Sequence, residues 1–115
     1  MASTKETLEH HLKCFVGLDL TGIIADYAPD AILFTPFGTL KGRDAIHALF
    51  QTLFVEFSKP GLFIAMEGQF VEGEYAYILW NAQSADKTYE TATDTFVIHD
   101  GKIVAQSFAA KITSR

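Results

Sequence analysis

The sequence contains one cysteine, three prolines and no long apolar run. A single cysteine, Cys14, cannot form an intrachain disulfide, which fits the reducing conditions of the cytoplasm. No apolar stretch approaches the roughly 18–20 residues of a membrane-spanning helix. The polar N-terminal stretch also lacks the apolar region of a signal peptide. We therefore expect a cytoplasmic protein that does not associate with membranes.

The chain is also poor in positive charge and in ligands for metals or phosphates. Its formal net charge is −5 and no basic cluster is longer than one or two residues, whereas binding to a phosphate backbone requires a positive footprint. His10 and His11 are adjacent, so on a helix they point in different directions and do not form a metal-binding pair. There is no glycine-rich phosphate loop. These patterns predict no nucleic-acid partner, no metal and no nucleotide cofactor.

What the sequence does contain is apolar and aromatic. Hydrophobic residues make up 49% of the 115 residues and aromatic residues 13%, including ten phenylalanines. This length corresponds to one domain with one core. A domain of this size cannot bury so many rings in a flat two-layer core. We therefore expect a lined cavity, an oligomer interface, or both.

Three helices are predicted in the first half of the chain. Ser3 and Glu6 form the pattern of a capping box at the start of the first helix, which is expected to end at Gly17. A short second helix is predicted to begin at Asp19 and to end before Pro29, since proline disfavours helical geometry in the preceding residue. The third helix has one apolar stripe at helical spacing. The first helix is predicted over about 4–16 and the third over about 43–58.

The rest of the chain has the pattern of strands joined by short turns. Strands are predicted over about 31–35, 37–41, 63–71, 75–84, 88–99 and 103–112. Asp100-Gly101 is a strong hairpin signal. With helices early and a strand meander late, we expect an α+β fold. In this fold a curved, mixed or antiparallel sheet packs on the three helices, in a single domain over residues 1–115.

Three segments resemble the nuclear-transport-factor-2-like superfamily, which includes the SnoaL-like polyketide cyclases and the ketosteroid isomerases. They are DLTGIIADYAPDAIL (19–33), GRDAI (42–46) and HDGKIV (99–104). The resemblance covers nearly the whole chain in the same order and implies a conical fold around an apolar pocket, commonly dimeric. Because the superfamily contains isomerases, dehydratases, epoxide hydrolases and ligand binders, the fold does not name the reaction.

The resemblance also implies candidate catalytic positions. The slot before Pro36, which holds the general-base Asp in the similar isomerases, holds Thr35. Asp94 matches their second carboxyl, which an apolar site keeps protonated so that it donates a hydrogen bond to the developing oxyanion. The position of the family's tyrosine on the first helix falls on His11. The resemblance therefore implies Asp94 as acid or hydrogen-bond donor, with His11 as its partner.

Pairing of the late strands predicts which side chains face the pocket. A two-residue turn at Ala85-Asp86 would place Ser84 opposite Lys87 and Tyr77 opposite Asp94. After the second hairpin, a two-residue loop would place Ser107 opposite Asp94, and a three-residue loop with a glycine bulge would place Gln106 there. The bulge is favoured because it also turns Phe108 inward. The predicted ligand-binding residues are Tyr27, Thr35, Phe50, Phe54, Tyr77, Leu79, Asn81, Phe96, Gln106 and Phe108.

Two functions remain open at this point. One is cofactor-free proton transfer, of the isomerase or cyclase type, on a hydrophobic carbonyl substrate. The other is a non-catalytic module that binds a ligand or assembles, which Thr35 in the base slot favours. The same pairing leaves Ile78, Trp80, Ala82 and Val97 on the outer face of the sheet. It therefore predicts a homodimer through that convex face with Trp80 near its centre.

Overall fold

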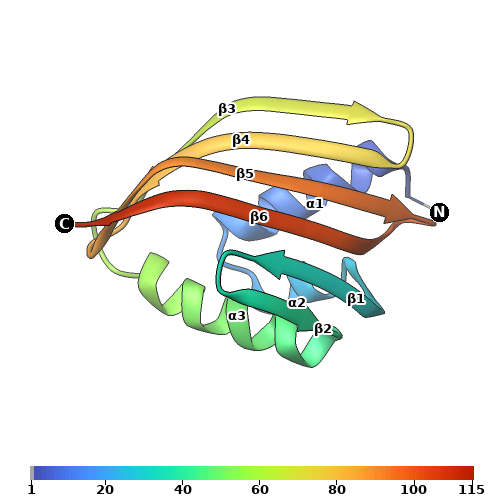
Figure 1. Ribbon diagram of the computed structural model, residues 1–115, viewed down its shortest axis with the longest axis horizontal. Helices are drawn as coiled ribbons and strands as arrows, with labels where there is room; N and C mark the ends of the chain where they lie inside the picture. The colour runs from blue at the N-terminus through green and yellow to red at the C-terminus, as the bar shows by residue number, and fades with distance from the viewer. Residues whose placement is uncertain (1) are drawn as a thin grey trace.

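The fold is a curved six-stranded sheet that wraps around helices on its concave side (Figure 1). The computed structural model describes residues 2–115. The strands lie in the order β2-β1-β6-β5-β4-β3, and only β1 and β6 pair in parallel. The predicted α+β class and the curved mixed sheet are thus confirmed. The elements are α1 (Thr4–Val16), α2 (Leu20–Ile24), β1 (Tyr27–Thr35), β2 (Gly38–Lys41), α3 (Arg43–Phe57), β3 (Phe63–Glu72), β4 (Tyr75–Gln83), β5 (Lys87–His99) and β6 (Lys102–Ser114).

The two long helices begin with different caps. At α1 the predicted capping box is present: the Glu6 amide donates to Ser3 Oγ and the Ser3 amide donates to Glu6 Oε1. At α3 the cap is Gly42, whose φ of 86° is a conformation that favours glycine. The Gly42 amide donates to Ala31 O at 2.8 Å. This bond fixes the start of α3 against β1 and thereby aims its apolar stripe at the sheet.

The second helix is shorter than predicted. It ends at Ile24, and Tyr27 and Ala28 already belong to β1. Pro29 accounts for the extended geometry of Ala28 just before it. The Ile103 amide donates to Asp26 O at 2.7 Å, so this segment is fixed beside β6. The prediction that the helix continues up to Pro29 was wrong because sheet pairing begins ahead of the proline.

The register between β4 and β5 corrects the predicted faces of β4. Close to the turn the pairing is as expected, since the Ser84 amide donates to Lys87 O at 2.9 Å. Further along, β5 holds one extra residue at Glu90 relative to both of its neighbours, and the pairing shifts by one. A shift of one residue exchanges the faces of a strand. Asp94 therefore pairs with Ile78 and not with Tyr77.

The consequence is that β4 presents its other face to the interior. Ile78, Trp80 and Ala82 point inward and are buried. The predicted inward set of Tyr77, Leu79 and Asn81 points outward instead. Trp80 is only 5% exposed, so the prediction that it lies at the centre of an exposed convex face was wrong.

The side chains of β6 face the predicted sides of the sheet, but the hairpin between β5 and β6 differs from the predicted one. Its loop has two residues, Asp100 and Gly101, both with positive φ, as a type I′ turn requires. The favoured three-residue loop was therefore wrong. An extra residue at Val104 then shifts the register within β6, so that Gln106 and Phe108 still face inward. Asp94 lies opposite Phe108, not opposite Gln106 or Ser107.

Candidate active site

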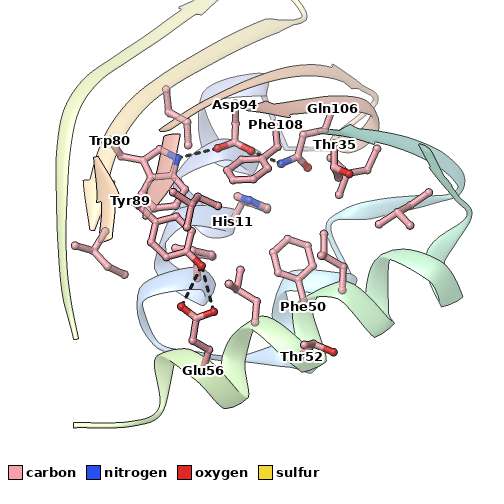
Figure 2. A pocket seen from close by; sticks show the side chains of 18 of the residues that line it. His11, Thr35, Phe50, Thr52, Glu56, Trp80, Tyr89, Asp94, Gln106 and Phe108 are labelled. Atoms are coloured by element: carbon pink, nitrogen blue, oxygen red, sulfur yellow. Dashed lines mark hydrogen bonds between the residues drawn. The ribbon is translucent and has the colours of Figure 1, made fainter. Parts of the chain in front are cut away.

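A cavity of about 410 Å³ lies between the concave side of the sheet and the helices (Figure 2). This volume falls in the range of pockets that bind drug-sized molecules. Phe37, which is 88% exposed at the turn between β1 and β2, and the half-exposed Lys87 also line it, so the cavity reaches the surface. Most of the lining is apolar, and it includes Leu33, Leu49, Leu53, Ile64, Ile78 and Phe108.

Asp94 is the carboxyl group held at one end of the cavity. Trp80 Nε1 donates to its Oδ2 at 2.8 Å, and Gln106 Nε2 donates to its Oδ1 at 2.8 Å. The Tyr27 hydroxyl in turn donates to Gln106 Oε1, which fixes the amide with its NH₂ toward Asp94. Trp80 is on β4, Gln106 on β6 and Tyr27 on β1, so the sheet itself sets the position of the carboxyl group.

The environment of Asp94 shifts its proton affinity. Burial raises the pKa of Asp94 to about 6, against the opposing effect of the hydrogen bonds from Trp80 and Gln106. Among residues 2–115, no cation lies within 4 Å of the carboxyl group to form an ion pair. A carboxyl group with this pKa is mostly ionised at pH 7 and still basic enough to accept a proton near neutral pH.

His11 lies in the same cavity, with its ring against three aromatic rings. The ring centroids are 5.1 Å from Phe96, 5.9 Å from Tyr27 and 6.1 Å from Phe50, all in edge-on arrangements. Its buried Nδ1 has no hydrogen-bond partner among residues 2–115. Burial lowers the pKa of His11 to about 3, so the imidazole is neutral. It forms no hydrogen bond with Asp94, and the predicted direct pair is not present.

A second carboxyl group, that of Glu56, faces the cavity from α3, on the helical side and away from Asp94 on β5 (Figure 2). Its Oε2 accepts from Ser84 Oγ at 2.7 Å and from the Tyr89 hydroxyl at 3.0 Å. Lys87 Nζ lies 3.6 Å from its Oε1. Burial, followed by the charge of Glu56, raises the pKa of the Tyr89 phenol. The Tyr89 hydroxyl therefore stays protonated and remains a donor.

The predicted ligand-binding residues fall into three groups in the structure. Thr35, Phe50, Gln106 and Phe108 line the cavity, as do both predicted catalytic residues. Tyr27, Phe54 and Phe96 are buried behind the lining. The third group is that of β4: Tyr77, Leu79 and Asn81 lie away from the cavity, and this part of the prediction was wrong because the bulge in β5 was not foreseen.

Thr35 lines the cavity but its hydroxyl is engaged in the turn. Thr35 Oγ1 donates to Gly38 O at 2.9 Å and accepts from the Phe37 amide at 3.1 Å. A hydroxyl bound on both sides to the backbone stabilises the β1–β2 turn. Thr35 is therefore a turn residue at the edge of the cavity.

Sequence reasoning missed several residues that line the cavity. The most important are Trp80, Tyr89, Glu56 and Lys87. One signal for Glu56 is present in the sequence, because a charged residue interrupts the apolar run Leu53–Phe57 on the cavity side of α3. For Trp80 no local signal exists, since its inward orientation depends on the register.

Within residues 2–115, no cluster of three or more His, Cys, Asp or Glu side chains has the arrangement of a metal site. In the same residues, every helix is too short or too polar to cross a bilayer.

Solved structures of several bacterial proteins share this architecture, and one of them is described as NTF2-like. An NTF2-like protein of unknown function from Cytophaga hutchinsonii superposes with a TM-score of 0.80 at 11% identity, covering 96% of this chain and 92% of that one. A candidate ketosteroid isomerase from Kribbella flavida gives 0.77 at 15% identity, covering 94% and 77%. A candidate polyketide cyclase from Sinorhizobium meliloti gives 0.74 at 18% identity, covering 89% and 92%. At these identities the likeness shows the fold alone.

The family itself follows from the sequence match. The model of the SnoaL-like domain matches residues 8–106, and the chain therefore belongs to the SnoaL-like family. No match to a curated protein was found.

Proposed function

We propose that this protein binds a hydrophobic carbonyl compound in the cavity and catalyses a proton transfer on it without a cofactor. The observation that carries this proposal is Asp94: a buried carboxyl group, held by two N–H donors, that faces an apolar cavity with a pKa of about 6. Asp94 acts as the base, which differs from the protonated donor that the resemblance implied. The family and the names of similar structures support this reaction class.

In this mechanism an Asp94 oxygen removes a proton from the carbon next to the substrate carbonyl. The resulting enolate carries its charge on the carbonyl oxygen, which requires a hydrogen-bond donor. Within residues 2–115 the neutral imidazole of His11 forms no hydrogen bond, and we assign its one N–H to this oxygen. Asp94 then returns the proton to another carbon, if the enolate is conjugated with a C=C bond, as in an isomerisation. In a cyclisation the enolate carbon attacks a second carbonyl, and Asp94 returns the proton to the alkoxide oxygen that this attack forms.

The test is exchange of carbon-bound hydrogen for deuterium. The methylene and methyl protons next to the carbonyl of 2-decanone exchange in D₂O if a base removes them, and ¹H NMR follows the loss of signal. Wild-type protein should accelerate exchange, and Asp94→Asn should reduce it by about a hundredfold or more, the usual range for a general base. Asp30→Asn, at an exposed position, is the matched control. Equal rates for wild type and Asp94→Asn would overturn the proposal.

A non-catalytic binding module is the second candidate function. It is favoured by one observation: Thr35 stands in the slot of the family's general base, and its hydroxyl is committed to the turn. Isothermal titration measures the binding of 2-decanone, and the exchange experiment measures its turnover. Binding without any hydrogen exchange would support the binding module.

We also propose that the protein forms a homodimer through the convex face of the sheet and that it is cytoplasmic, as its single cysteine suggests. With Trp80 inside, the exposed rings on this face include Phe70, Tyr75 and Tyr77, which are 64%, 61% and 37% exposed. An aromatic patch of this kind fits a second copy of itself. Light scattering should give twice the chain mass of 12.7 kDa, and Tyr77→Glu should give the monomer. A monomeric wild type would overturn this proposal.

A further inference from the structure

Glu56, Lys87 and Tyr89, which we call the Glu56 cluster, form a second polar group in the cavity. All three side chains line it. The Tyr89 hydroxyl donates to both Glu56 oxygens, at 3.0 and 3.2 Å, and Lys87 Nζ lies 3.6 Å from Oε1. Ser84 completes the contacts of Glu56 from outside the lining. The proposed proton transfer at Asp94 uses none of these residues.

The cluster has hydrogen-bonding capacity that its own contacts do not use. A carboxylate can accept about four hydrogen bonds and an ammonium can donate three. Glu56 accepts from two hydroxyl groups and contacts one ammonium, and Lys87 makes one contact within the cluster. Thr52, one helical turn before Glu56 on α3, adds a further hydroxyl to the same lining. A ligand group that reaches this end of the cavity therefore meets both a charged acceptor and a charged donor.

The two polar ends are joined by a continuous aromatic surface. The rings of Trp80 and Tyr89 are stacked with centroids 5.8 Å apart and planes inclined by 25°. The indole N–H of Trp80 points to Asp94, whereas the hydroxyl of Tyr89 points to Glu56 (Figure 2). A ligand whose carbonyl lies at Asp94 can thus extend along these rings and place its far end at the Glu56 cluster.

The charges of the cluster select the group at that far end. A ligand carboxylate would be attracted by Lys87 but repelled by Glu56, and a ligand ammonium would be attracted by Glu56 but repelled by Lys87, so the pair favours neither charge. A neutral hydroxyl can donate to the Glu56 carboxylate and accept from the Lys87 ammonium at the same time. We propose that the ligand is an amphipathic hydroxy ketone, with its carbonyl at Asp94, an apolar body along Trp80 and Tyr89, and a hydroxyl at the Glu56 cluster. This inference rests on the proposed function of the Asp94 end.

The experiment compares chain-matched ligands by isothermal titration calorimetry. The probes are 2-alkanones of eight to twelve carbons and the same ketones with a hydroxyl at the other end of the chain. The series of lengths allows the hydroxyl to find the cluster. A hydroxyl normally weakens binding to an apolar pocket, because it loses its hydrogen bonds to water. At the best length, wild type should instead bind the hydroxy ketone about tenfold more tightly than the plain ketone, as expected for a hydrogen bond to a charged group.

The readout for each variant is the ratio of its two affinities, so an overall change in binding cancels. Glu56→Gln keeps the shape but removes the charge, and it should lose most of the advantage of the hydroxyl. Lys87→Met, at a half-exposed side chain, should lose part of it. Glu72→Gln, at an exposed position of β3, is the matched control and should keep the wild-type ratio.

The possible results separate this inference from the proposed function. Binding of both series with no advantage for the hydroxyl at any length, or an advantage that survives Glu56→Gln, would overturn the inference and leave the Asp94 proposal standing. Tighter binding of the ω-amino or ω-carboxy ketones would also overturn it. Absence of binding by every ketone would overturn the proposed function and this inference together.

Discussion

The two carboxyl groups of the cavity differ in what compensates their burial. Asp94 accepts hydrogen bonds from two neutral N–H groups, of Trp80 and Gln106, with no cation at ion-pair distance among residues 2–115. Glu56 accepts from two hydroxyl groups and has the Lys87 ammonium 3.6 Å away. Burial dominates at Asp94 and raises its pKa to about 6.

The difference shows how one cavity can assign separate tasks to the same chemical group. A carboxylate without a cation holds its negative charge at a cost in free energy, and accepting a proton relieves that cost. A carboxylate that contacts an ammonium and hydroxyl donors has partners for its charge, and it can hold a ligand hydroxyl and tie two elements together. The contacts of Glu56 with Ser84 and Tyr89 connect α3 to the β4–β5 hairpin.

The largest expected effect that tests this comparison is a pH dependence of stability. The pKa of Asp94 is raised from 3.8 to about 6 in the folded protein, so between these values the folded state binds more protons than the unfolded state. Stability from this group is therefore lost as the pH rises from about 4 to 6. The loss is about 3 kcal/mol, since one pKa unit corresponds to about 1.4 kcal/mol.

Urea unfolding of wild type and Asp94→Asn at pH 4, 5, 6 and 7 measures this effect. The free energy of unfolding of wild type should fall relative to the variant across the range. His11 contributes equally to the pH dependence of stability in both proteins, so its contribution cancels in the difference between wild type and Asp94→Asn. Parallel pH profiles would show that the folded protein does not raise the pKa of Asp94, and the contrast with Glu56 would fail.

The second prediction compares the two stacked rings, since Trp80 donates to Asp94 and Tyr89 donates to Glu56. Trp80→Phe removes the indole N–H that Asp94 accepts, so the pKa of Asp94 should rise above about 6 and the protein should lose about 2 kcal/mol of stability, as for a hydrogen bond to a charged group. The midpoint of the pH profile of 2-decanone exchange should move to higher pH. Tyr89→Phe, whose lost hydroxyl donates to Glu56, should leave that midpoint in place. A common shift in both variants would contradict the separation of the two ends.

The smallest effect concerns the structural role of Glu56. Ser84→Ala removes the 2.7 Å hydrogen bond to Glu56 Oε2 and also the 3.0 Å bond that Ser84 Oγ accepts from the Lys87 amide. It should reduce the free energy of unfolding by about 1 kcal/mol or more. It should leave the pH profile of exchange unchanged, because Ser84 does not contact Asp94. Chemical denaturation measures the loss, with Ser107→Ala at an exposed position as the control. If Ser84→Ala reduces the free energy of unfolding no more than Ser107→Ala does, the contact between Ser84 and Glu56 does not stabilise the fold.

Much of the fold was predictable because its signals are local. The capping box at Ser3 and Glu6, the apolar stripe of α3 and the Asp100-Gly101 turn each depend on a few neighbouring residues. The faces of β4 depend on a distant pairing instead. Both of its faces are rich in apolar residues, with Ile78 and Trp80 on one and Tyr77 and Leu79 on the other. Alternation alone therefore could not show which face is buried.

The same division applies to the candidate site. Asp94, His11, Gln106 and Phe108 were found through a family resemblance and a strand pattern, and all four line the cavity. The Glu56 cluster was not found, since Tyr89 and Ser84 lie 33 and 28 residues from Glu56 in the sequence. Neither spacing corresponds to a local motif. Only the folded hairpin brings these side chains to α3.

The extra residues in the strands have a consequence for the size of the cavity. β3 and β5 each hold one more residue than β4 beside them, and both extra residues, Glu67 and Glu90, are exposed glutamates. Such insertions lengthen one strand and bend it. Deleting Glu90 would restore strict alternation, with Tyr89 inward, Thr91 outward and Ala92 inward. The same side chains would still face the helices, but across a flatter sheet. Relatives could therefore alter the room for a ligand by gaining or losing single surface residues, without replacing any side chain that lines the cavity.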